Sequence, residues 1–571
     1  MSPIDAINYA KKLAPVNPQQ TKIILLDTLK QHPEYHEGWA LLADTYKKLK
    51  EHDEHKHAVK QYEMIFWFNK QLETAKQYLY NQNPRKAEQI IKHLLQLVPN
   101  EYRALSTLAD IAFEIGDSRA CLAITTHNLE ANPLKTELLE HYCKTLFNDK
   151  QFQNLITFYQ TSVTSPTPQI ESLVAAAYVK MMQFDKAITL YKRLLSKNFH
   201  PAQCHLRVGN IEKIRGNNQL AISHFKKAIK LNSKLGEAYW NLANLKTYKF
   251  DGNDLDNLEQ QVQSTESNLN TAQLHFALAK AYEQQYKFDL AFVELKKANT
   301  IQKSLTSYKP SNFTSRCKKH FQERPLSTNK SDDTLQLIFI VSLPRSGSTL
   351  VEQILGSHPA VDTSYELTEI NAIARELESK KRSDVPYGLD TISEKEKVKY
   401  ATRYLKFIEP LRGNNNIFID KQPINFHHIA LIKTLFPTAK IIEVTRDKAA
   451  TAWSLYKHSF AEGHAYSYEF TSLAEYINDY YEIMSHWHAL YPNEIFTLDY
   501  QNLINEFTNT VDKLLGYCGL SMHENCLSFY KHKRPIMTPS SEQVRQPIYR
   551  DALTEWTNYK DHLEPLLRLL R

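Results

Sequence analysis

The chain has 571 residues, 42% hydrophobic and 23% charged, which is the composition of a globular protein and excludes a disordered one. Its formal net charge of +7 is small for this length, so it suits an anionic ligand but gives no reason to expect nucleic-acid binding. Glycine is scarce, with 13 residues, and this favours a largely helical protein.

The beginning of the chain and its cysteines indicate the compartment. The first twenty residues lack the apolar segment of a signal peptide, and no window approaches the roughly 18 apolar residues of a membrane helix. The six cysteines form no C-x-x-C pair, which is typical of reduced thiols. We therefore expect a soluble cytoplasmic protein with no membrane partner.

Similar segments recur through residues 4–300. Ala87, Ala120, Ala187 and Ala221 hold matching positions and are separated by 33, 67 and 34 residues. A period near 34 built from two helices is the signature of tetratricopeptide repeats, and the segments 37–49, 103–117 and 236–248 match the first helix of a unit. Such arrays form concave surfaces that bind peptides, although an array can also serve only as a scaffold or a dimerisation surface.

A different pattern follows a predicted connector at 301–333 and defines a second domain at 334–571. Apolar, β-branched runs predict strands that alternate with amphipathic helices. The expected strands are 335–341, 416–420, 439–444 and 494–500, and the expected helices include 348–355 and 425–437. Alternation of this kind predicts a parallel sheet with helices on both faces and a ligand at the carboxyl ends of the strands.

The loop "SLPRSGST" (342–349) follows the first of these strands and opens a helix. Its backbone N–H groups from 345 to 349 would form an anion-binding concavity at a helix N-terminus. A nucleotide-hydrolysing phosphate loop carries a lysine where this loop has Ser348, and that absence argues against ATP hydrolysis. Arg345 instead offers a planar fork for a phosphate-linked oxyanion.

The loop and four further motifs together resemble a known family. The motifs are "FIDKQPINFHHIALIKTLFPTAKIIEVTRD", "SLYKHSF", "LDYQNL" and "PSSEQVRQPIYRDALTEW". In this order they resemble sulfotransferases, in particular tyrosylprotein sulfotransferases and bacterial proteins that fuse tetratricopeptide repeats to a sulfotransferase domain. The resemblance covers about 335–571 and implies a nucleotide-binding α/β fold with 3′-phosphoadenosine 5′-phosphosulfate (PAPS) as the donor and no metal.

The same resemblance implies roles for individual residues. Glu366 corresponds to the general base, with Glu369 as a competing candidate, and Lys421 to the lysine that neutralises the bridging oxygen. Arg345 would stabilise the transition state as well as bind the donor. The implied donor-binding residues are Arg345, Ser346, Gly347, Ser348, Thr349, Arg446, Ser454, Tyr500, Ser541 and Arg545.

Two of these assignments have simpler alternatives. Ser348 and Thr349 could cap a helix, and Arg446, implied to hold the 3′-phosphate together with Ser454, could form a surface salt bridge. For Ser348 and Thr349, helix capping and donor binding could coexist.

Three positions depart from the family pattern. Tyr365 replaces a glycine before the general base, His458 replaces a nucleotide-binding arginine, and Glu555 replaces a lysine. The loss of two cations predicts either weaker donor binding or a 3′-phosphate that is held by other groups.

The sequence thus predicts a PAPS-dependent sulfotransferase that acts on a hydroxyl group, with tyrosine of a peptide or protein recruited by the repeats as the expected acceptor. A small phenol or a sugar hydroxyl is an alternative acceptor, because a fold does not fix a substrate. Alternative functions are a catalytically weak repeat scaffold that binds nucleotide and a phosphate-loop phosphotransferase. A shorter chain that starts near Ser331 is expected to retain nucleotide binding.

Overall fold

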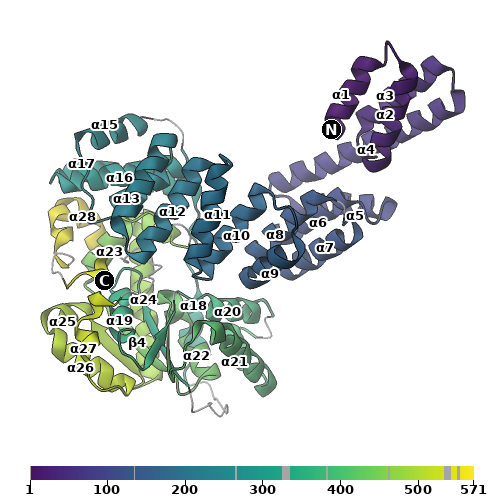
Figure 1. Ribbon diagram of the computed structural model, residues 1–571. Coiled ribbons are helices and arrows are strands. Elements are labelled where there is room, and N and C mark those ends of the chain that lie inside the picture. The colour runs from purple at the N-terminus through teal and green to yellow at the C-terminus, as the bar shows by residue number, and fades with distance from the viewer. Residues whose placement is uncertain are drawn as a thin grey trace. The chain divides into compact units, whose positions relative to one another are not determined.

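The computed structural model describes residues 2–133, 135–263, 267–323, 335–364, 366–380, 383–460, 463–532, 542–548 and 553–570. The chain divides into two compact units, Met1–Leu194 and Leu195–Arg571. Figure 1 shows that the first unit is built of helices, whereas the second combines helices with a sheet.

Consecutive antiparallel helices form the first unit, and all except α4 have 11 to 14 residues. They are α1 (Pro3–Leu13), α2 (Pro18–Gln31), α3 (His36–Leu49), α4 (His52–Tyr80), α5 (Pro84–Leu97), α6 (Tyr102–Glu114), α7 (Ser118–Ala131), α8 (Thr136–Asn148), α9 (Phe152–Ser162), α10 (Pro168–Lys180) and α11 (Phe184–Ser196). Asn-Pro pairs begin two of them: Asn17 and Asn83 accept backbone hydrogen bonds as N-caps, and the proline after each occupies the first helical position.

The alanines of the repeat pattern serve packing. Ala87, Ala187 and Ala221 are fully buried, and only Ala120 is partly exposed. In the first unit the packing forms separate clusters. One surrounds Leu25 and Leu42, and the next surrounds Ile91 and Leu94. The predicted helical repeat architecture is confirmed.

Further helix pairs begin the second unit. They are α12 (Pro201–Arg215), α13 (Asn218–Leu231), α14 (Gly236–Ala243), α15 (Gly252–Gln261), α16 (Leu269–Gln284), α17 (Phe288–Leu305) and α18 (Phe313–His320). Helix α14 ends five residues before the predicted end at 248. The reason is a distant contact: the backbone N–H groups of Lys246 and Thr247 donate to the Glu542 carboxylate at 2.5 and 3.0 Å.

The predicted connector also contains regular structure. Helix α17 continues to Leu305, and α18 covers part of the stretch that was expected to be irregular. Cys317 of α18 is fully buried, and Phe321 after it lies 6.1 Å from the ring of Trp487. Hydrophobic packing against the following domain, which periodicity in so short a segment does not reveal, explains this helix.

The sheet has five parallel strands in the order β2-β3-β1-β4-β5. They are β1 (Gln336–Ser342), β2 (Val361–Thr363), β3 (Ile417–Lys421), β4 (Lys440–Thr445) and β5 (Ile495–Asp499). Four were predicted, and β2 was not, because three residues carry no detectable alternation. The predicted helix at 425–437 is a 3-10 segment, η3 (Pro423–His428), followed by α22 (Ile429–Leu435). The predicted fold class, a helical repeat array followed by an α/β domain with a parallel sheet, is confirmed.

Helices cover both faces of the sheet. They are α19 (Ser348–Leu355), α20 (Glu369–Ser379), α21 (Glu394–Ile408), α22, α23 (Lys448–Tyr456), α24 (Phe470–Leu490), α25 (Tyr500–Asn505), α26 (Phe507–Cys518), α27 (Glu524–Leu527) and α28 (Lys560–Leu567). Alternate residues of β1 point to opposite faces. Ile338 and Ile340 join the core under α19 and α26, whereas Phe339 joins a second core.

This second core crosses from the sheet domain into the repeats. It contains Phe339 and Phe418 of the sheet together with Trp240 of α14, Phe276 of α16 and Leu295 of α17. The last repeats of the chain and the α/β domain therefore form one continuous hydrophobic core.

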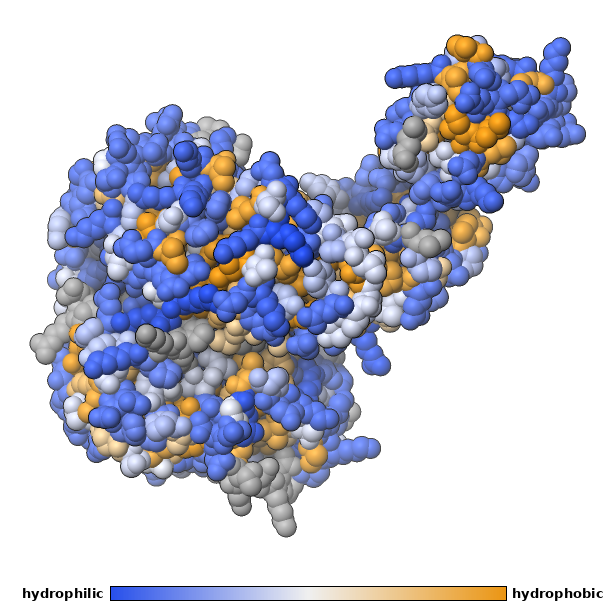
Figure 2. All heavy atoms as spheres, in the orientation of Figure 1, coloured by the Kyte–Doolittle hydropathy of each residue, from blue (hydrophilic) through white to orange (hydrophobic). Residues whose placement is uncertain are grey.

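The surface is mostly polar on the face drawn in Figure 2, and the cysteines are buried. Figure 2 shows mostly hydrophilic side chains on the drawn face, with apolar side chains gathered over the N-terminal helices, where Ile4, Ile23 and Leu26 are exposed. Within the described ranges, no helix combines the length and the apolar sequence needed to cross a bilayer. The six cysteines are buried and form no disulfide, as predicted.

Candidate active site

The predicted site residues converge at the carboxyl ends of the strands. The loop 343–347 follows β1, Lys421 ends β3, Arg446 follows β4 and Tyr500 follows β5. In a parallel sheet these ends lie along one edge, and β1 is central, with β3 and β4 on either side of it. This is the edge at which ligands bind in open α/β sheets.

The ring of Tyr500 packs closely against the loop after β1 at Gly347. Gly347 is the N-cap of α19 with φ +102°, and a Cβ at this position would lie 2.4 Å from Cδ2 of the Tyr500 ring. Only glycine fits this backbone and this close approach. Because Gly347 is the N-cap, neither Ser348 nor Thr349 caps the helix, and the capping alternative is wrong.

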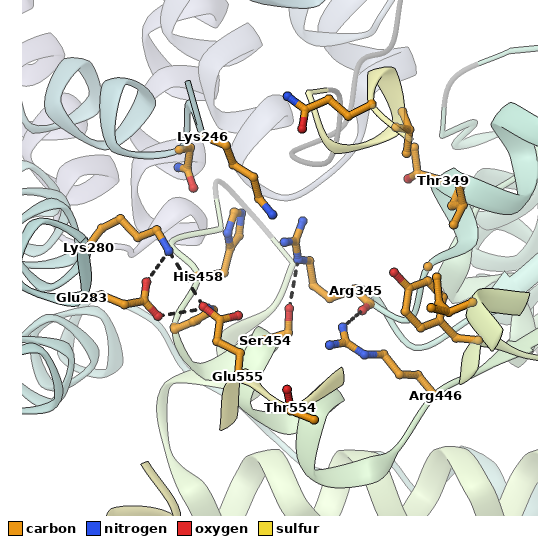
Figure 3. Close-up of a pocket in the computed structure, with 18 of the residues that line it drawn as sticks. Lys246, Lys280, Glu283, Arg345, Thr349, Arg446, Ser454, His458, Thr554 and Glu555 are labelled. Carbon is orange, nitrogen blue, oxygen red and sulfur yellow. Dashed lines mark hydrogen bonds and ion pairs between the residues drawn. The ribbon is translucent and has the colours of Figure 1, made fainter. Parts of the chain in front are cut away.

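A cavity of about 580 Å³ lies beside the loop. Its lining includes Arg345, Gly347, Ser348, Thr349, Arg446, Ser454 and Tyr500, while Ser346 is buried within the loop. Nε of Arg345 donates to the Ser454 hydroxyl at 3.3 Å, as Figure 3 shows. Seven of the predicted donor-binding residues are therefore neighbours around one cavity.

Arg446 lines the cavity and donates a hydrogen bond to the backbone of the loop. Its Nη1 donates to the Arg345 carbonyl oxygen at 3.0 Å, and its guanidinium lies 5.5 Å from the centre of the Tyr500 ring. The residue points into the cavity in Figure 3, and a donor-binding role for Arg446 stays a prediction.

An acid–base pair lies at the end of β3. Nζ of Lys421 is 2.6 Å from Oε1 of Glu366, and Lys421 is fully buried while Glu366 remains 41% exposed. Lys421 pairs in register with Ile340 of β1, two residues before that strand ends at Ser342, and it does not line the cavity. A second carboxylate, that of Glu352 on α19, is 3.8 Å from the same Nζ.

The competing base candidate is engaged elsewhere. Oε1 of Glu369 lies 2.6 Å from Nε of Arg403, and the Glu369 side chain is only 10% exposed. Glu366 is thus the carboxylate that is both accessible and next to Lys421.

The repeats supply cavity residues that the sequence analysis missed. Lys246 follows α14, and Lys280 and Glu283 lie on α16; all three line the cavity opposite the loop (Figure 3). Glu352 was also missed, although an acidic residue inside the apolar helix 348–355 was a signal for a buried counter-ion. For the lysines the only signal was the lack of cations at 458 and 555.

Position 555 is part of a charge network across the cavity. Lys457 contacts the Glu555 carboxylate directly and lies 3.4 Å from Glu283, while Lys280 contacts Glu283 and lies 4.0 Å from Glu555. Burial favours a raised pKa for Glu555, but Lys457 and Lys280 outweigh it and hold this pKa well below the usual range of a carboxyl group.

Position 458 carries no charge. His458 is buried and its ring packs edge-on against Trp240 of the repeats at 5.3 Å. Burial, reinforced by the neighbouring charge of Arg345, lowers the pKa of His458 well below that of a free imidazole, so the ring is neutral at pH 7.

Lys246 remains a cation. Burial lowers the pKa of its amine only to about 8, and the amine is mostly charged at pH 7.

Arg545 of the C-terminal segment contacts a helix of the repeats. Nη2 of Arg545 donates to the Ile214 carbonyl oxygen of α12 at 2.8 Å, whereas its neighbours Val544 and Gln546 line the cavity. The guanidinium thus contacts the repeats, and a donor-binding role for Arg545 stays a prediction. Ser541 and Tyr365 lie outside the described residues.

No group of three or more His, Cys, Asp or Glu side chains is placed to hold a metal ion in the described part of the chain. The polar groups around the cavity are instead hydroxyls, cations and the backbone of a glycine loop. Such a set is chemically suited to an anion.

Comparison with known proteins identifies the α/β domain. Residues 337–524 match the sulfotransferase family. An uncharacterized protein of Aquifex aeolicus (strain VF5) is 32% identical over 335 residues, which cover 55% of this chain and 44% of that protein. The chain thus spans less than half the length of this relative.

Two further relatives carry names. Protein-tyrosine sulfotransferase A of Caenorhabditis elegans is 24% identical over 280 residues, covering 43% of this chain and 70% of that protein. Protein-tyrosine sulfotransferase 2 of Gallus gallus is 21% identical over 270 residues, covering 41% and 69%. Among solved structures, the sulfotransferase domain of the Synechococcus PCC 7002 olefin synthase is 19% identical, with a TM-score of 0.31, over 40% of this chain and 90% of that one.

Proposed function

We propose that this chain, in which a sulfotransferase-family domain at 337–524 follows tetratricopeptide-like repeats, transfers a sulfuryl group from PAPS to a hydroxyl group. The proposed acceptor is a tyrosine of a peptide or protein. The observation that carries the proposal is the convergence of the glycine loop, Arg446 and Ser454 on one cavity, with the Glu366–Lys421 pair at the end of β3, the strand next to β1.

The donor would lie along this edge of the sheet. Backbone N–H groups at the start of α19 and the hydroxyls of Ser348 and Thr349 suit the 5′-phosphosulfate, and Arg446 and Ser454 suit the 3′-phosphate. The cavity of about 580 Å³ is within the size range of sites for a ligand as large as a nucleotide.

The transfer itself would need one base and one cation. The Glu366 carboxylate accepts the proton of the acceptor hydroxyl while the oxygen of that hydroxyl forms a bond to sulfur. The bond between sulfur and the bridging oxygen breaks, and the electron pair stays on the 5′-phosphate of the leaving 3′-phosphoadenosine 5′-phosphate (PAP). The ammonium of Lys421, which is buried and pre-positioned, would stabilise the charge that develops on the bridging oxygen.

Recruitment of the acceptor is proposed for the repeats of the first unit. Helical repeat arrays bind extended chains on a concave face, and this unit exposes apolar side chains such as Ile23 and Trp67. An acceptor held there would be present at a raised effective concentration near Glu366.

The alternatives are less well supported. A phosphotransferase needs a lysine on the transferred phosphate and a carboxylate for Mg²⁺, but the loop has Ser348 at the lysine position, and the acidic side chains in the cavity lining, Glu283 and Glu555, are paired with lysines. A weak scaffold would not require the intact Glu366–Lys421 pair. A small phenol remains a useful second acceptor for the assay.

Substitution of the base tests the proposal. The assay measures transfer of the sulfuryl group from PAPS to a tyrosine peptide. We expect Glu366→Gln to lower kcat by about 10²–10⁴-fold and to leave PAP affinity unchanged, because the base acts on the acceptor proton. Glu369→Gln, three residues further along the chain, is the matched control and should retain turnover. Unchanged kcat in Glu366→Gln would contradict the proposed mechanism, and lack of any PAPS-dependent transfer by the unaltered chain would contradict the function.

A further inference from the structure

Two lysines of the repeats reach the cavity from separate helix pairs. Lys246 lies in the turn after α14 and Lys280 on α16, and both line the cavity that also contains Arg345, Arg446 and Ser454. Figure 3 shows both side chains extending toward the space in front of Arg345 and Ser454. Both lysines belong to the repeats and lie outside the residues that match the sulfotransferase family.

The charge of the cavity depends on these lysines. On the side formed by the α/β domain, Lys457 and Glu555 contact each other and cancel, and His458 is buried against Trp240. The repeats contribute Lys246 and Lys280 to the lining and Lys213 of α12 beside it, against the carboxylates of Glu283 and Glu542, which leaves one net positive charge. Near Ser454, the positive charge that supplements Arg345 and Arg446 therefore comes from the repeats.

The turn that carries Lys246 is held in place from the C-terminal segment. The buried Glu542 accepts hydrogen bonds from the backbone N–H groups of Lys246 and Thr247 and, at 3.1 Å, from the side-chain amide of Asn218. Two residues later, Val544 lines the cavity. The C-terminal segment therefore both fixes the turn that carries Lys246 and forms part of the cavity wall.

We infer that Lys246 and Lys280 bind the 3′-phosphate of the donor, so that the last repeats form part of the nucleotide site. A phosphate monoester carries close to two negative charges at pH 7, more than Arg446 and the Ser454 hydroxyl alone can neutralise. Both lysines interact with carboxylates, Lys280 with Glu283 in direct contact and Lys246 with the charges of Glu555 and Glu542. The direct contact makes Lys280 the weaker contributor. This inference rests on the proposed function and assigns to the repeats a role beyond acceptor recruitment.

Nucleotide binding to the full chain tests the inference by calorimetry. Lys246→Met removes the charge and keeps the apolar stem and the backbone N–H that binds Glu542. We expect it to raise the Kd for PAP about tenfold or more, as for loss of a hydrogen bond between charged groups, and Lys280→Met to raise it severalfold. Affinity for AMP, which lacks the 3′-phosphate, should change little in either variant.

Two controls accompany these variants. Lys246→Arg keeps the charge and should retain most of the PAP affinity, and Lys249→Met removes an exposed charge three residues further along the same turn and should leave it unchanged. Steady-state kinetics should show a raised KM for PAPS and an unchanged KM for the acceptor.

The outcomes separate the inference from the proposed function. Absence of PAP binding to the unaltered chain would overturn the proposed function and with it the inference. Tight PAP binding by the unaltered chain together with unaltered binding by Lys246→Met would overturn the inference alone. An equal loss for PAP and AMP, or an effect confined to the KM of the acceptor, would also overturn it.

Discussion

The repeats of the first unit and the repeats of the second unit share one architecture but differ in what they pack against. In the first unit, side chains such as Leu94 on α5 form clusters made only of repeat helices. In the second unit, Leu274 on α16 belongs to a core that continues through Phe339 into the sheet domain.

This difference shows that a repeat pattern does not define a folding unit. The periodicity that predicts tetratricopeptide helices is the same on both sides of Leu194, because it reports only the packing of neighbouring helices. What distinguishes the later repeats is long-range: aromatic contacts such as Phe288 with Tyr559 and Trp240 with His458 join them to the α/β domain. They are structurally part of the second unit.

Two truncated chains give the largest expected effect. A chain that starts at Leu195 keeps the second unit and should bind PAP as tightly as the full chain. A chain that starts at Ser331 lacks one aromatic partner of each of Tyr456, Tyr559 and Trp487, namely Phe292, Phe288 and Phe321. Each exposed aromatic side chain costs about 1.5–3 kcal/mol, against a typical domain stability of about 5–15 kcal/mol.

We therefore expect the chain from Ser331 to lose cooperative unfolding and PAP binding, contrary to the expectation from sequence. Circular dichroism melting curves and calorimetric titration of both chains measure this. A soluble chain from Ser331 that melts cooperatively and binds PAP like the chain from Leu195 would remove the distinction between the two sets of repeats.

A matched pair of core substitutions gives the next largest effect. Leu94 and Leu274 are both buried leucines, 0% and 2% exposed, so substitution by alanine should cost each unit about 2–5 kcal/mol. A ligand stabilises only the unit that binds it. Scanning calorimetry should show two unfolding transitions, and PAP should raise the Tm of only one of them. Leu274→Ala should lower the Tm of that PAP-sensitive transition, and Leu94→Ala should lower the Tm of the other. A PAP-sensitive transition lowered equally by both variants would contradict the comparison.

The pH dependence of PAP binding gives the smallest effect. Lys246, with Glu542, Glu555, Lys280 and Arg345 around it, has a pKa lowered to about 8 mainly by burial. Below this pH the amine is charged and attracts phosphate, and above it the attraction is lost, so PAP affinity should fall as pH rises from about 7 to about 9. Calorimetric titrations across this range should show a smaller fall for Lys246→Met than for the unaltered chain. Parallel curves would assign the fall to another group.

The features that the sequence predicted are local. The glycine loop, Lys421, Arg446 and Tyr500 each follow an apolar strand, and strand ends of a parallel sheet necessarily meet at one edge. Their approach to one another therefore follows from the alternation of strands and helices.

The features that it missed depend on contacts between distant segments. Helix α14 ends early because Glu542 binds the backbone that follows it, Arg545 turns to Ile214 of α12, and Lys246 and Lys280 meet the loop only through packing of the repeats on the sheet domain. Neither propensity nor periodicity carries this information.

The charge network around Glu555 couples residues that lie far apart in the chain, because a change of charge at one of them alters the interactions of the others. A lysine at 555 would face Lys457 and Lys280 at the distances where Glu555 now neutralises them, and like charges so close would repel each other. A change of sign at 555 is therefore tolerated only together with a change on α16 or at the end of α23. Among related chains, positions 280, 457 and 555 are accordingly expected to vary as a set.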